Sequence, residues 1–473
     1  MNPLRGHRVR SIIANRIAAA RMSPLHTSAS CRTSPENTIP AEWLRRILAD
    51  RSETSPKLYA WTLANLPGIA APPPATAPSA ADTEHRRIYI LGVGNMGRLY
   101  ATCLARRRPA AERPPITLVV HKRELLEHWA SHPGIELARA GQPQAERRAD
   151  FAIEWWTPTR PEVGPVAEPA AQIPNLIVAT KAADALPTVD SLRRYLGPRS
   201  TVAFAQNGMC KLWPPTGAAY ARARFAPQKS PSWLACVTTH GVTSLGPFRS
   251  LHAAPANALV GPVLLNADTA AEAEYLVDQL ARAPGLECRR VPRRELWVAQ
   301  LEKLVVNAVI NPLTAVLRCK NGELFARRDG SEDLAPVIDA LVDEASRTLC
   351  ALVVDPSTEP ILAGDGVQKN GDSAKSLKAE RETLLERFSF SSLQKMLLVV
   401  GEKVAENTSS MLQDVRAGKQ TEIQDFNGWL VETARYIDKD VRLPLHEKLI
   451  TLVEDGAVLS REQLRRHLIP TER

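Results

Sequence analysis

Short apolar runs alternate with amphipathic stretches through residues 86–264 of the chain. Apolar runs bounded by glycines and polar residues predict buried strands, whereas apolar residues spaced three and four apart predict helices. Strands that alternate with helices form parallel sheets with crossover connections. The expected strands lie in the segments 86–97, 116–123, 175–184, 201–209, 232–241 and 256–264.

The pattern changes near residue 293, where the strand signals end. The segments that follow, from "RRELWVAQLEKLVVNAVINPLTAVL" to "IQDFNGWLVETARYI", carry helical spacing. A polar segment at 355–380 interrupts them and is expected to be a surface loop. The sequence therefore predicts an α/β domain over residues 86–292 and an all-α domain over residues 293–473.

The residues ahead of the first expected strand form an extension, 36–85, with a different character. Its part at 40–66 has the spacing of one or two helices, "AEWLRRILADR" and "KLYAWTLANL". Residues 67–84 are rich in proline and alanine and are typical of a flexible linker. The folded body is therefore expected to begin near Arg86.

The net charge of +9 comes mainly from the first 35 residues, which contain six arginines and no Asp, Glu or Lys. Subtracting these six leaves +3 for the other residues, so no nucleic-acid partner is indicated. An acid-free, arginine-rich leader with a short amphipathic stretch is typical of a transit peptide, and residues 1–35 predict a mitochondrial location. The alternative is a basic tail on a cytoplasmic protein.

Two further classes of protein are disfavoured by composition. No run of 18 apolar residues occurs, so no membrane-spanning helix is expected. The seven cysteines are scattered without any CxxC or Cys/His cluster, so neither a disulfide framework nor a metal site is expected.

A glycine motif follows the first expected strand. Gly92, Gly94 and Gly97 form GxGxxG between a strand and a helix, with Val93, Asn95 and Met96 at the intervening positions. In this context the glycines permit a tight turn, a close approach to a pyrophosphate and close helix packing. The motif therefore predicts a Rossmann-type dinucleotide site, and a glycine turn without a ligand is the alternative.

The end of the second expected strand bears on the choice of nicotinamide cofactor. An acidic residue there would bind the ribose 2′-hydroxyl, but this chain has His121, Lys122 and Arg123. Two cations suit a 2′-phosphate, so NADP(H) is the expected cofactor. The alternative is that Lys122 and Arg123 are a solvated surface pair.

A polar stripe runs through the apolar segment "LEKLVVNAVINPL", residues 301–313. Lys303, Asn307 and Asn311 are four residues apart, which places them along one side of a helix. Because burying them without partners is costly, the stripe is expected to face a polar cleft. Alternatively, Lys303 reaches solvent and the asparagines stabilise a kink at Pro312.

These motifs converge on a known family. Residues 86–455 resemble the ketopantoate reductase (2-dehydropantoate 2-reductase) family. The resemblance rests on the segments "LGVGNMG", "TKAAD", "QNGM", "VTTHG", "ELWVAQLEKLVVNAVINPLTAVLRCKNGEL", "ENTSSMLQDV" and "TEIQDFNGWL". The resemblance implies a Rossmann domain followed by a helical domain, a 6-phosphogluconate-dehydrogenase-like arrangement, with the active site between them.

The resemblance also implies a reaction. This is the NADPH-dependent reduction of 2-dehydropantoate to (R)-pantoate on the route to pantothenate and coenzyme A, by a monomer or homodimer. Two alternatives stay open: a reductase of another branched 2-oxo acid, and a non-catalytic organellar protein that binds or regulates.

Site roles carry over by resemblance, position by position. Lys303 matches the general acid, and Glu422 matches an active-site acid that also contacts the cofactor. Asn207 is expected to contact cofactor and substrate, and Lys181 to lie near the nicotinamide. The other residues expected around the substrate are Asn307, Asn311, Asn321, Asn407 and Ser410, the last two sharing a helix face.

Overall fold

The computed structural model describes residues 42–50, 55–68, 84–106, 113–327, 329–364, 372–438 and 440–469. All of them belong to one compact unit that spans residues 40–473. The leader at 1–35 and most of the Pro/Ala-rich linker lie outside the described residues.

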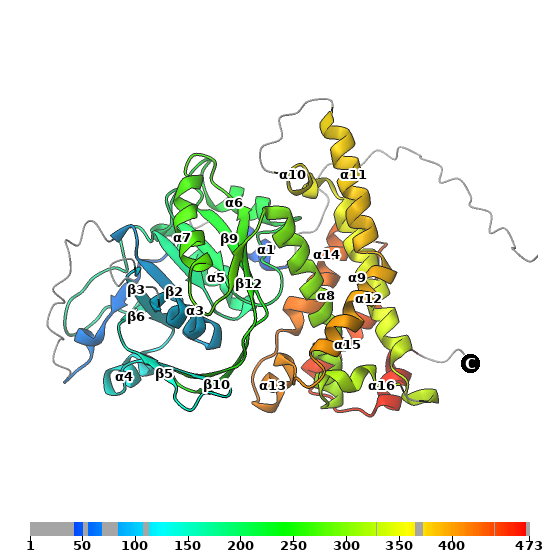
Figure 1. Ribbon diagram of the computed structural model, residues 1–473. Coiled ribbons are helices and arrows are strands. Elements are labelled where there is room, and N and C mark those ends of the chain that lie inside the picture. The colour runs from blue at the N-terminus through cyan, green and yellow to red at the C-terminus, as the bar shows by residue number, and fades with distance from the viewer. Residues whose placement is uncertain are drawn as a thin grey trace, which may run out of the picture. The chain divides into compact units, whose positions relative to one another are not determined.

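A nine-stranded sheet forms the first half of this unit (Figure 1). Its six central strands are parallel, whereas β1 at one edge and β12 near the other run antiparallel to their inner neighbours. In order across the sheet the strands are β1 (Tyr59–Trp61), β6 (Ala152–Thr157), β3 (Ile116–Val120), β2 (Ile88–Leu91), β7 (Asn175–Val178), β8 (Thr201–Phe204), β9 (Ser232–Thr238), β12 (Ala258–Leu264) and β13 (Cys288–Arg290).

Both faces of the sheet are covered, which is why its central strands are apolar throughout. Ile88 and Ile90 point to one face, and Tyr89 and Leu91 to the other, because side chains alternate along a strand. The first face packs against α3 (Asn95–Ala105), α4 (Arg123–Ser131) and α7 (Ala270–Ala281). The second packs against α5 (Ala182–Ser191), α6 (Gly217–Arg224) and α8 (Arg293–Leu317).

A second sheet of four strands, which the hydrophobic pattern does not predict, lies beside α3. Its order is β10 (Gly241–Gly246), β11 (Arg249–Ala254), β4 (Ile135–Arg139) and β5 (Glu146–Arg148). The buried Arg98 of α3 holds it, donating from Nη1 to the carbonyls of Gly246 and Arg249 at 2.9 and 2.7 Å.

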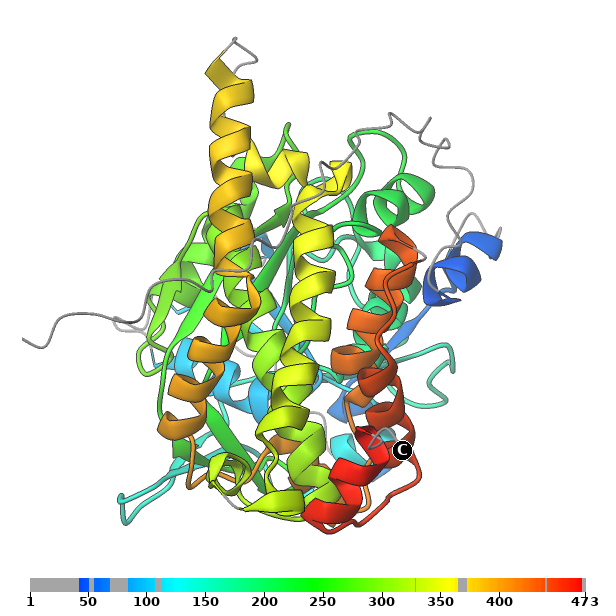
Figure 2. The same ribbon diagram turned by 90° about the vertical axis from the view of Figure 1, so that its right-hand side faces the viewer.

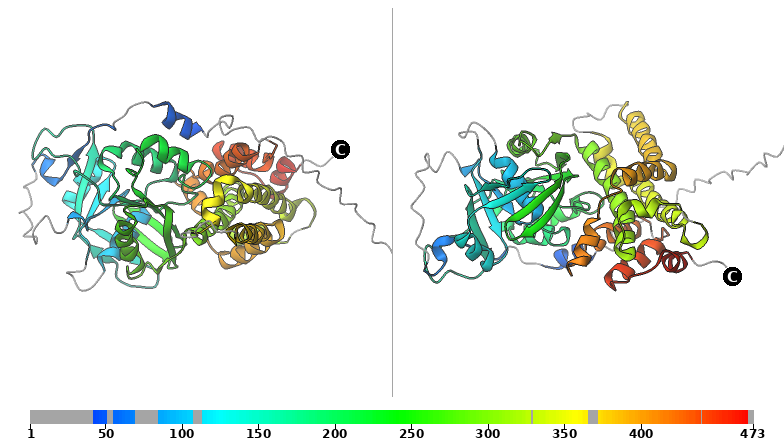
Figure 3. Two further views of the ribbon diagram at one scale, coloured as in Figure 1. Left: turned by 90° about the horizontal axis from the view of Figure 1, so that it is seen from above. Right: turned by 60° about the horizontal axis from the view of Figure 1, so that its bottom comes forward.

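The second half is helical, as expected, and α8 is its link to the sheet. This helix lies between the sheet and the other helices (Figures 1 and 3) and packs on β9 and β12 as well as on those helices. One apolar cluster therefore continues from the sheet into the helices. The other helices are α9 (Ala335–Val354), α10 (Glu359–Leu362), α11 (Asp372–Arg387), α12 (Phe390–Lys403), α13 (Ser410–Arg416), α14 (Trp429–Ile437), α15 (Pro444–Glu454) and α16 (Arg461–Leu468). No described helix is long and apolar enough to cross a bilayer.

Two sequence expectations fail at the N-terminal extension. The helix α1 (Glu42–Ala49) forms, but the second expected helix is wrong: residues 59–61 are β1 and Leu63–Asn65 a 3₁₀ turn. Since β1 pairs with β6, the folded body does not begin near Arg86. The register joins Tyr59 to Thr157 and Trp61 to Trp155.

The polar segment at 355–380 is also more regular than expected. A 3₁₀ turn at Pro356–Thr358 and the short α10 occupy its start, and α11 begins at Asp372. Figure 2 shows the gold α11 extending beyond the ends of its neighbours. Because α11 carries charged residues on most of its sides, its sequence has too few apolar residues to show helical spacing.

Candidate active site

Lys303 reaches from the helical half to the sheet. From the middle of α8 its Nζ donates to the carbonyl of Thr238 at 2.5 Å and to Oδ1 of Asn207 at 3.0 Å. Thr238 ends β9, and Asn207 follows the end of β8. These strands are parallel, so the lysine lies at the carboxyl edge of the sheet, where open α/β folds bind ligands.

Glu422 completes a cluster with these two residues. It is buried just ahead of the π-helix η8 (Gln424–Gly428), and Nδ2 of Asn207 donates to its Oε2 at 3.4 Å. Burial lowers the pKa of Lys303 to about 8, against the opposing effect of the Glu422 charge. A lysine of this kind can both hold and release a proton near neutral pH.

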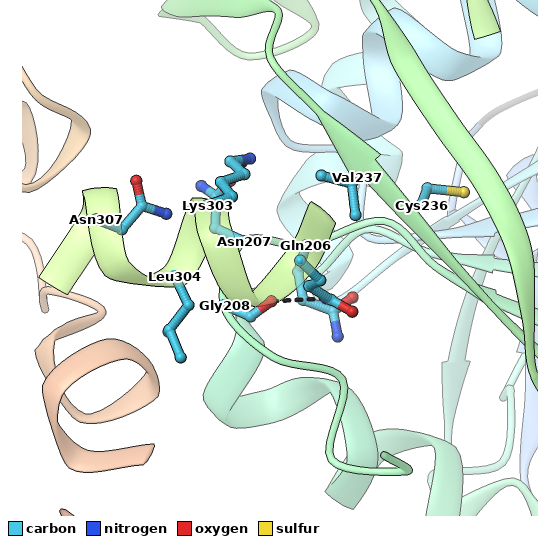
Figure 4. A pocket seen from close by; sticks show the side chains of 9 residues that line it. Gln206, Asn207, Gly208, Cys236, Val237, Lys303, Leu304 and Asn307 are labelled. Carbon is cyan, nitrogen blue, oxygen red and sulfur yellow. Dashed lines mark hydrogen bonds between the residues drawn. The ribbon is translucent and has the colours of Figure 1, made fainter. Parts of the chain in front are cut away.

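A pocket opens at this cluster (Figure 4). Figure 4 shows Lys303 and Asn307 on one side of α8, with Leu304 on the other. Asn311 is buried and is not among the lining residues, because positions four apart drift around a helix by about 40° per step. The lining is made by Gln206, Asn207, Gly208, Cys236, Val237, Gln300, Lys303, Leu304 and Asn307.

The glycine turn has the shape that a dinucleotide requires. Gly92 has φ +92°, and a Cβ there would lie 2.9 Å from Ala179 and Thr180. A Cβ on Gly97 would lie 2.1 Å from the carbonyl oxygen of Gly92. Around Gly94, which precedes α3, a Cβ would meet nothing within 4 Å. This open cradle at a helix N-terminus fits a pyrophosphate.

The residues between the glycines have different surroundings. Val93 is buried, and Met96 packs against the apolar cluster of the first sheet face. The side chain of Asn95 is already engaged: Nδ2 donates to the Val242 carbonyl at 3.2 Å, and Oδ1 accepts from Ser250. Asn95 can therefore serve a phosphate through its backbone N–H.

Lys122 and Arg123 lie where β3 passes into α4, beside this cradle. Lys122 precedes the helix and is exposed. The guanidinium of Arg123 is held on two sides: Nε donates to Glu127 at 2.8 Å, and the ring of Trp61 lies 5.6 Å away. The strand β1 of the extension thus reaches the end of β3 that the ribose of a dinucleotide would approach.

Lys181 precedes α5 and forms an ion pair with Asp414 of α13, with Nζ and Oδ2 2.6 Å apart. This pair joins the sheet half to the helical half. Its lysine is half-exposed, so the pair contributes little to stability.

The remaining expected substrate residues lie where the 3₁₀ turn η5 (Asn321–Phe325) after α8 meets the loop before α13. The backbone N–H of buried Asn321 donates to the carbonyl of exposed Asn407 at 3.1 Å. Within the described residues Oδ1 of Asn321 is buried and has no hydrogen-bond partner.

Asn407 and Ser410 do not share a helix face, contrary to expectation. The helix α13 begins only at Ser410, because the Ser409 hydroxyl accepts from the N–H of Leu412 at 3.1 Å and caps it. Ser409 is buried and shares a 2.7 Å hydrogen bond with Thr314 of α8. Sequence analysis missed this serine, although a Ser before a helical pattern is itself a capping signal.

Gln300 is a second residue that sequence reasoning missed. One turn ahead of Lys303, it donates from Nε2 to the Gly208 carbonyl at 2.7 Å and accepts from Nε1 of Trp213 at 2.6 Å. It therefore fixes the loop that carries Asn207. The available signal was a lone amide three residues before the lysine in an apolar helix.

Comparisons with known proteins agree with this architecture. The family model "Ketopantoate reductase PanE/ApbA" matches residues 88–264, and "Ketopantoate reductase PanE/ApbA C terminal" matches residues 295–456. The chain is 41% identical to a ketoisovalerate reductase of Gibberella fujikuroi, across 90% of this chain and 98% of that protein. It is 39% identical to a ketoisovalerate reductase of Beauveria bassiana, across 92% and 100%.

A solved structure shares the fold. A probable 2-dehydropantoate 2-reductase from Bacillus subtilis matches with a TM-score of 0.52 at 21% identity, covering 78% of this chain and 99% of that one.

Proposed function

The chain belongs to the ketopantoate reductase family, and on that premise we propose that it reduces 2-ketoisovalerate to 2-hydroxyisovalerate with NADPH. The family's members are NAD(P)H-dependent reductases of 2-oxo acids. Two relatives about 40% identical over about 90% of the chain are ketoisovalerate reductases, which favours this substrate over 2-dehydropantoate. We therefore replace the expected substrate, 2-dehydropantoate, by the alternative, another branched 2-oxo acid. The expected place in pantothenate synthesis is dropped with it.

The observation that carries the proposal is the position of Lys303 between the sheet edge and Glu422. Bound NADPH supplies a hydride to the keto carbon. The keto oxygen then gains negative charge, and a protonated lysine beside it stabilises that charge and donates the proton. With a pKa of about 8, Lys303 is mostly protonated at neutral pH and gives up its proton readily.

Neutral amides suit the rest of a small 2-oxo acid. Asn307 on the same side of α8, and Asn207 at the sheet edge, are proposed to orient the carboxylate and keto group without adding charge. By resemblance, Asn321, Asn407 and Ser410 stay proposed substrate residues, whereas the buried Asn311 does not line the pocket. The apolar Val237, which also lines the pocket, is suited to a branched alkyl chain.

For the cofactor we propose NADPH rather than NADH. The support is the pair Lys122 and Arg123 beside the glycine cradle, where a 2′-phosphate would need cations. Gly92, Gly94 and Gly97 bind the pyrophosphate through backbone groups, helped by Val93, Asn95 and Met96. Lys181 is assigned to the nicotinamide side, and Asn207 and Glu422 to both cofactor and substrate.

Steady-state kinetics with purified protein test the proposal. We expect kcat/KM for 2-ketoisovalerate to exceed that for 2-dehydropantoate by roughly 10–200-fold, the usual range for discrimination between substrates that differ by a small group. The two acids differ by a hydroxymethyl group at C3. A preference for 2-dehydropantoate would restore the first expectation. Absence of turnover with any branched 2-oxo acid would favour a binding or regulatory role.

We also propose import into mitochondria, on the strength of the arginine-rich, acid-free residues 1–35 alone. Cell fractionation that finds only full-length protein in the cytosol would contradict it.

A further inference from the structure

The helix α8 contains a gap in its backbone hydrogen bonding. Pro312 has no N–H, so it cannot donate to the carbonyl of Ala308 four residues earlier. That carbonyl is nonetheless satisfied, because Nδ2 of Asn427 donates to it at 2.9 Å. Asn427 belongs to the π-helix η8 and is fully buried. A side chain from a distant segment thus replaces the missing amide.

The orientation of the Asn427 amide follows from its partners. The Leu341 carbonyl can only accept, so Nε2 of His446, 3.1 Å away, must carry the proton. Nδ1 of His446 is then an acceptor, 2.8 Å from Nδ2 of Asn427. Burial lowers the pKa of His446 to about 4, which keeps the ring neutral. Both Nδ2 protons therefore have an acceptor, one on His446 and one on Ala308.

The bond joins the two catalytic segments close to their functional residues. Ala308 adjoins Asn307 and lies five residues beyond Lys303, while Asn427 lies five residues beyond Glu422. The π-helix also packs against the Asn207 loop: a Cβ on Gly208 would lie 3.0 Å from the Asp425 carbonyl oxygen. π-Helical turns occur often at functional sites, where they reposition side chains.

We propose that Asn427 is a positioning residue, which sets the placement of Lys303 relative to Glu422 by filling the hydrogen-bonding gap that Pro312 leaves in α8. The inference rests on the proposed role of Lys303 as proton donor. The side-chain hydrogen bonds of Asn427 within the described residues go to Ala308 and His446, not to Lys303 or Glu422. It acts through the helix backbone.

A double-mutant cycle separates positioning from core packing. Asn427→Ala removes the donor, whereas Pro312→Ala gives α8 its own N–H for Ala308. We expect Asn427→Ala to lower kcat about tenfold or more and to displace the alkaline limb of the pH profile, with KM for NADPH unchanged. Adding Pro312→Ala should restore kcat and return the alkaline limb of the pH profile to its original position. The melting temperature should stay low, because Nδ1 of His446 still lacks the hydrogen bond that Asn427 donates.

Asn266→Ala is the matched control. Asn266 is also buried and donates from Nδ2 to two carbonyls, of Gln228 and Ser230, at 2.9 and 2.7 Å. It lies near Ser232, at the opposite end of β9 from Thr238. This variant should lose stability while kcat and the pH profile stay normal.

A readout without turnover makes the outcomes distinguishable. The pH dependence of Lys303 acetylation by acetic anhydride, followed by mass spectrometry, reports the pKa of this lysine directly. A shift in Asn427→Ala that Pro312→Ala reverses would support positioning even if no 2-oxo acid were reduced. An active enzyme whose kcat and Lys303 pKa are unchanged in Asn427→Ala, or not restored in the double variant, would overturn the inference. If Asn427→Ala does not fold, Asn427→Ser takes its place.

Discussion

Lys303 shows how one residue gains its chemistry from its neighbours. A lysine on a solvated helix face has a pKa near 10.5, too high for ready proton release at neutral pH. Here burial lowers it, and two oxygen acceptors with the Glu422 carboxylate keep the charged form in place. The balance leaves a cationic group that is ready to give up its proton.

Replacing this lysine tests its role. We expect Lys303→Ala to lower kcat by roughly 10²–10⁴, the usual contribution of a general acid. KM for NADPH should change little, because we assign the phosphates to the glycine turn, away from Lys303. The control is Glu302→Ala, at the position next to Lys303. It removes a surface ion pair with Arg387 and should keep normal kcat. Normal turnover with a lowered melting temperature in Lys303→Ala would make this lysine structural.

The direction of the pH dependence follows from the lowered pKa. In the proposed role of Lys303, reduction requires the protonated lysine, which is present below about pH 8 and lost above it. We therefore expect kcat/KM for reduction to fall about tenfold per pH unit above that point, and oxidation of the hydroxy acid to rise. Initial rates in both directions measure this. A flat alkaline profile in the unaltered protein would contradict it.

At the scale of elements, the edge strand β1 extends the nucleotide-binding sheet. Its Trp61 donates from Nε1 to the Thr159 carbonyl at 2.8 Å, packs 5.3 Å from Trp155 and lies under Arg123. A strand ahead of the family-matched region thus supports a residue that we assign to the cofactor.

Cofactor kinetics test this support. We expect Trp61→Ala to raise KM for NADPH by about 2–30-fold, the equivalent of a cation–π contact of about 0.5–2 kcal/mol, and to leave KM for NADH nearly unchanged. Trp61→Phe keeps an aromatic face and should have a smaller effect. Replacing Lys122 and Arg123 together by alanine should exceed both. Equal use of NADPH and NADH by the unaltered protein would contradict the assignment of Lys122 and Arg123 to the 2′-phosphate.

How far the sequence predicts these elements depends on their burial. Strands such as Ile116–Val120 are buried on both faces, so their apolar runs are plain. The strand Glu146–Arg148 consists of charged residues at an exposed edge, and Tyr59–Trp61 is only three residues long, so neither leaves a pattern.

The candidate site divides in the same way. Lys303, Asn307 and the glycines stand out because polar or small residues interrupt apolar segments. The Thr238 carbonyl is backbone and has no sequence signal, and Asn427 matters only because folding brings it to Ala308.

At the scale of the molecule, the described residues of the extension belong to the same compact unit as the body. The edge of β6 is covered by β1, and an uncovered edge strand tends to pair with other chains. Where the protein can be shortened therefore depends on β1 rather than on the end of the linker.

Deletions test this directly. Removing residues 1–39 should leave melting temperature and kcat unchanged. Removing residues 1–68 takes away α1 and β1, and we expect a lower melting temperature, concentration-dependent aggregation and a raised KM for NADPH. Thermal unfolding and light scattering measure the difference. Identical behaviour of the two shortened proteins would show that β1 is dispensable.

The helix α8 has a consequence for chimeras between relatives. One side of it packs on β9 and β12, and the other on α9, α12, α13 and α15. A crossover at residue 292 would join the sheet of one parent to an α8 that evolved against the sheet of the other. Such a hybrid would mismatch the surface that brings Lys303 to Thr238. Successful recombination should therefore inherit β9, β12 and α8 from a single parent.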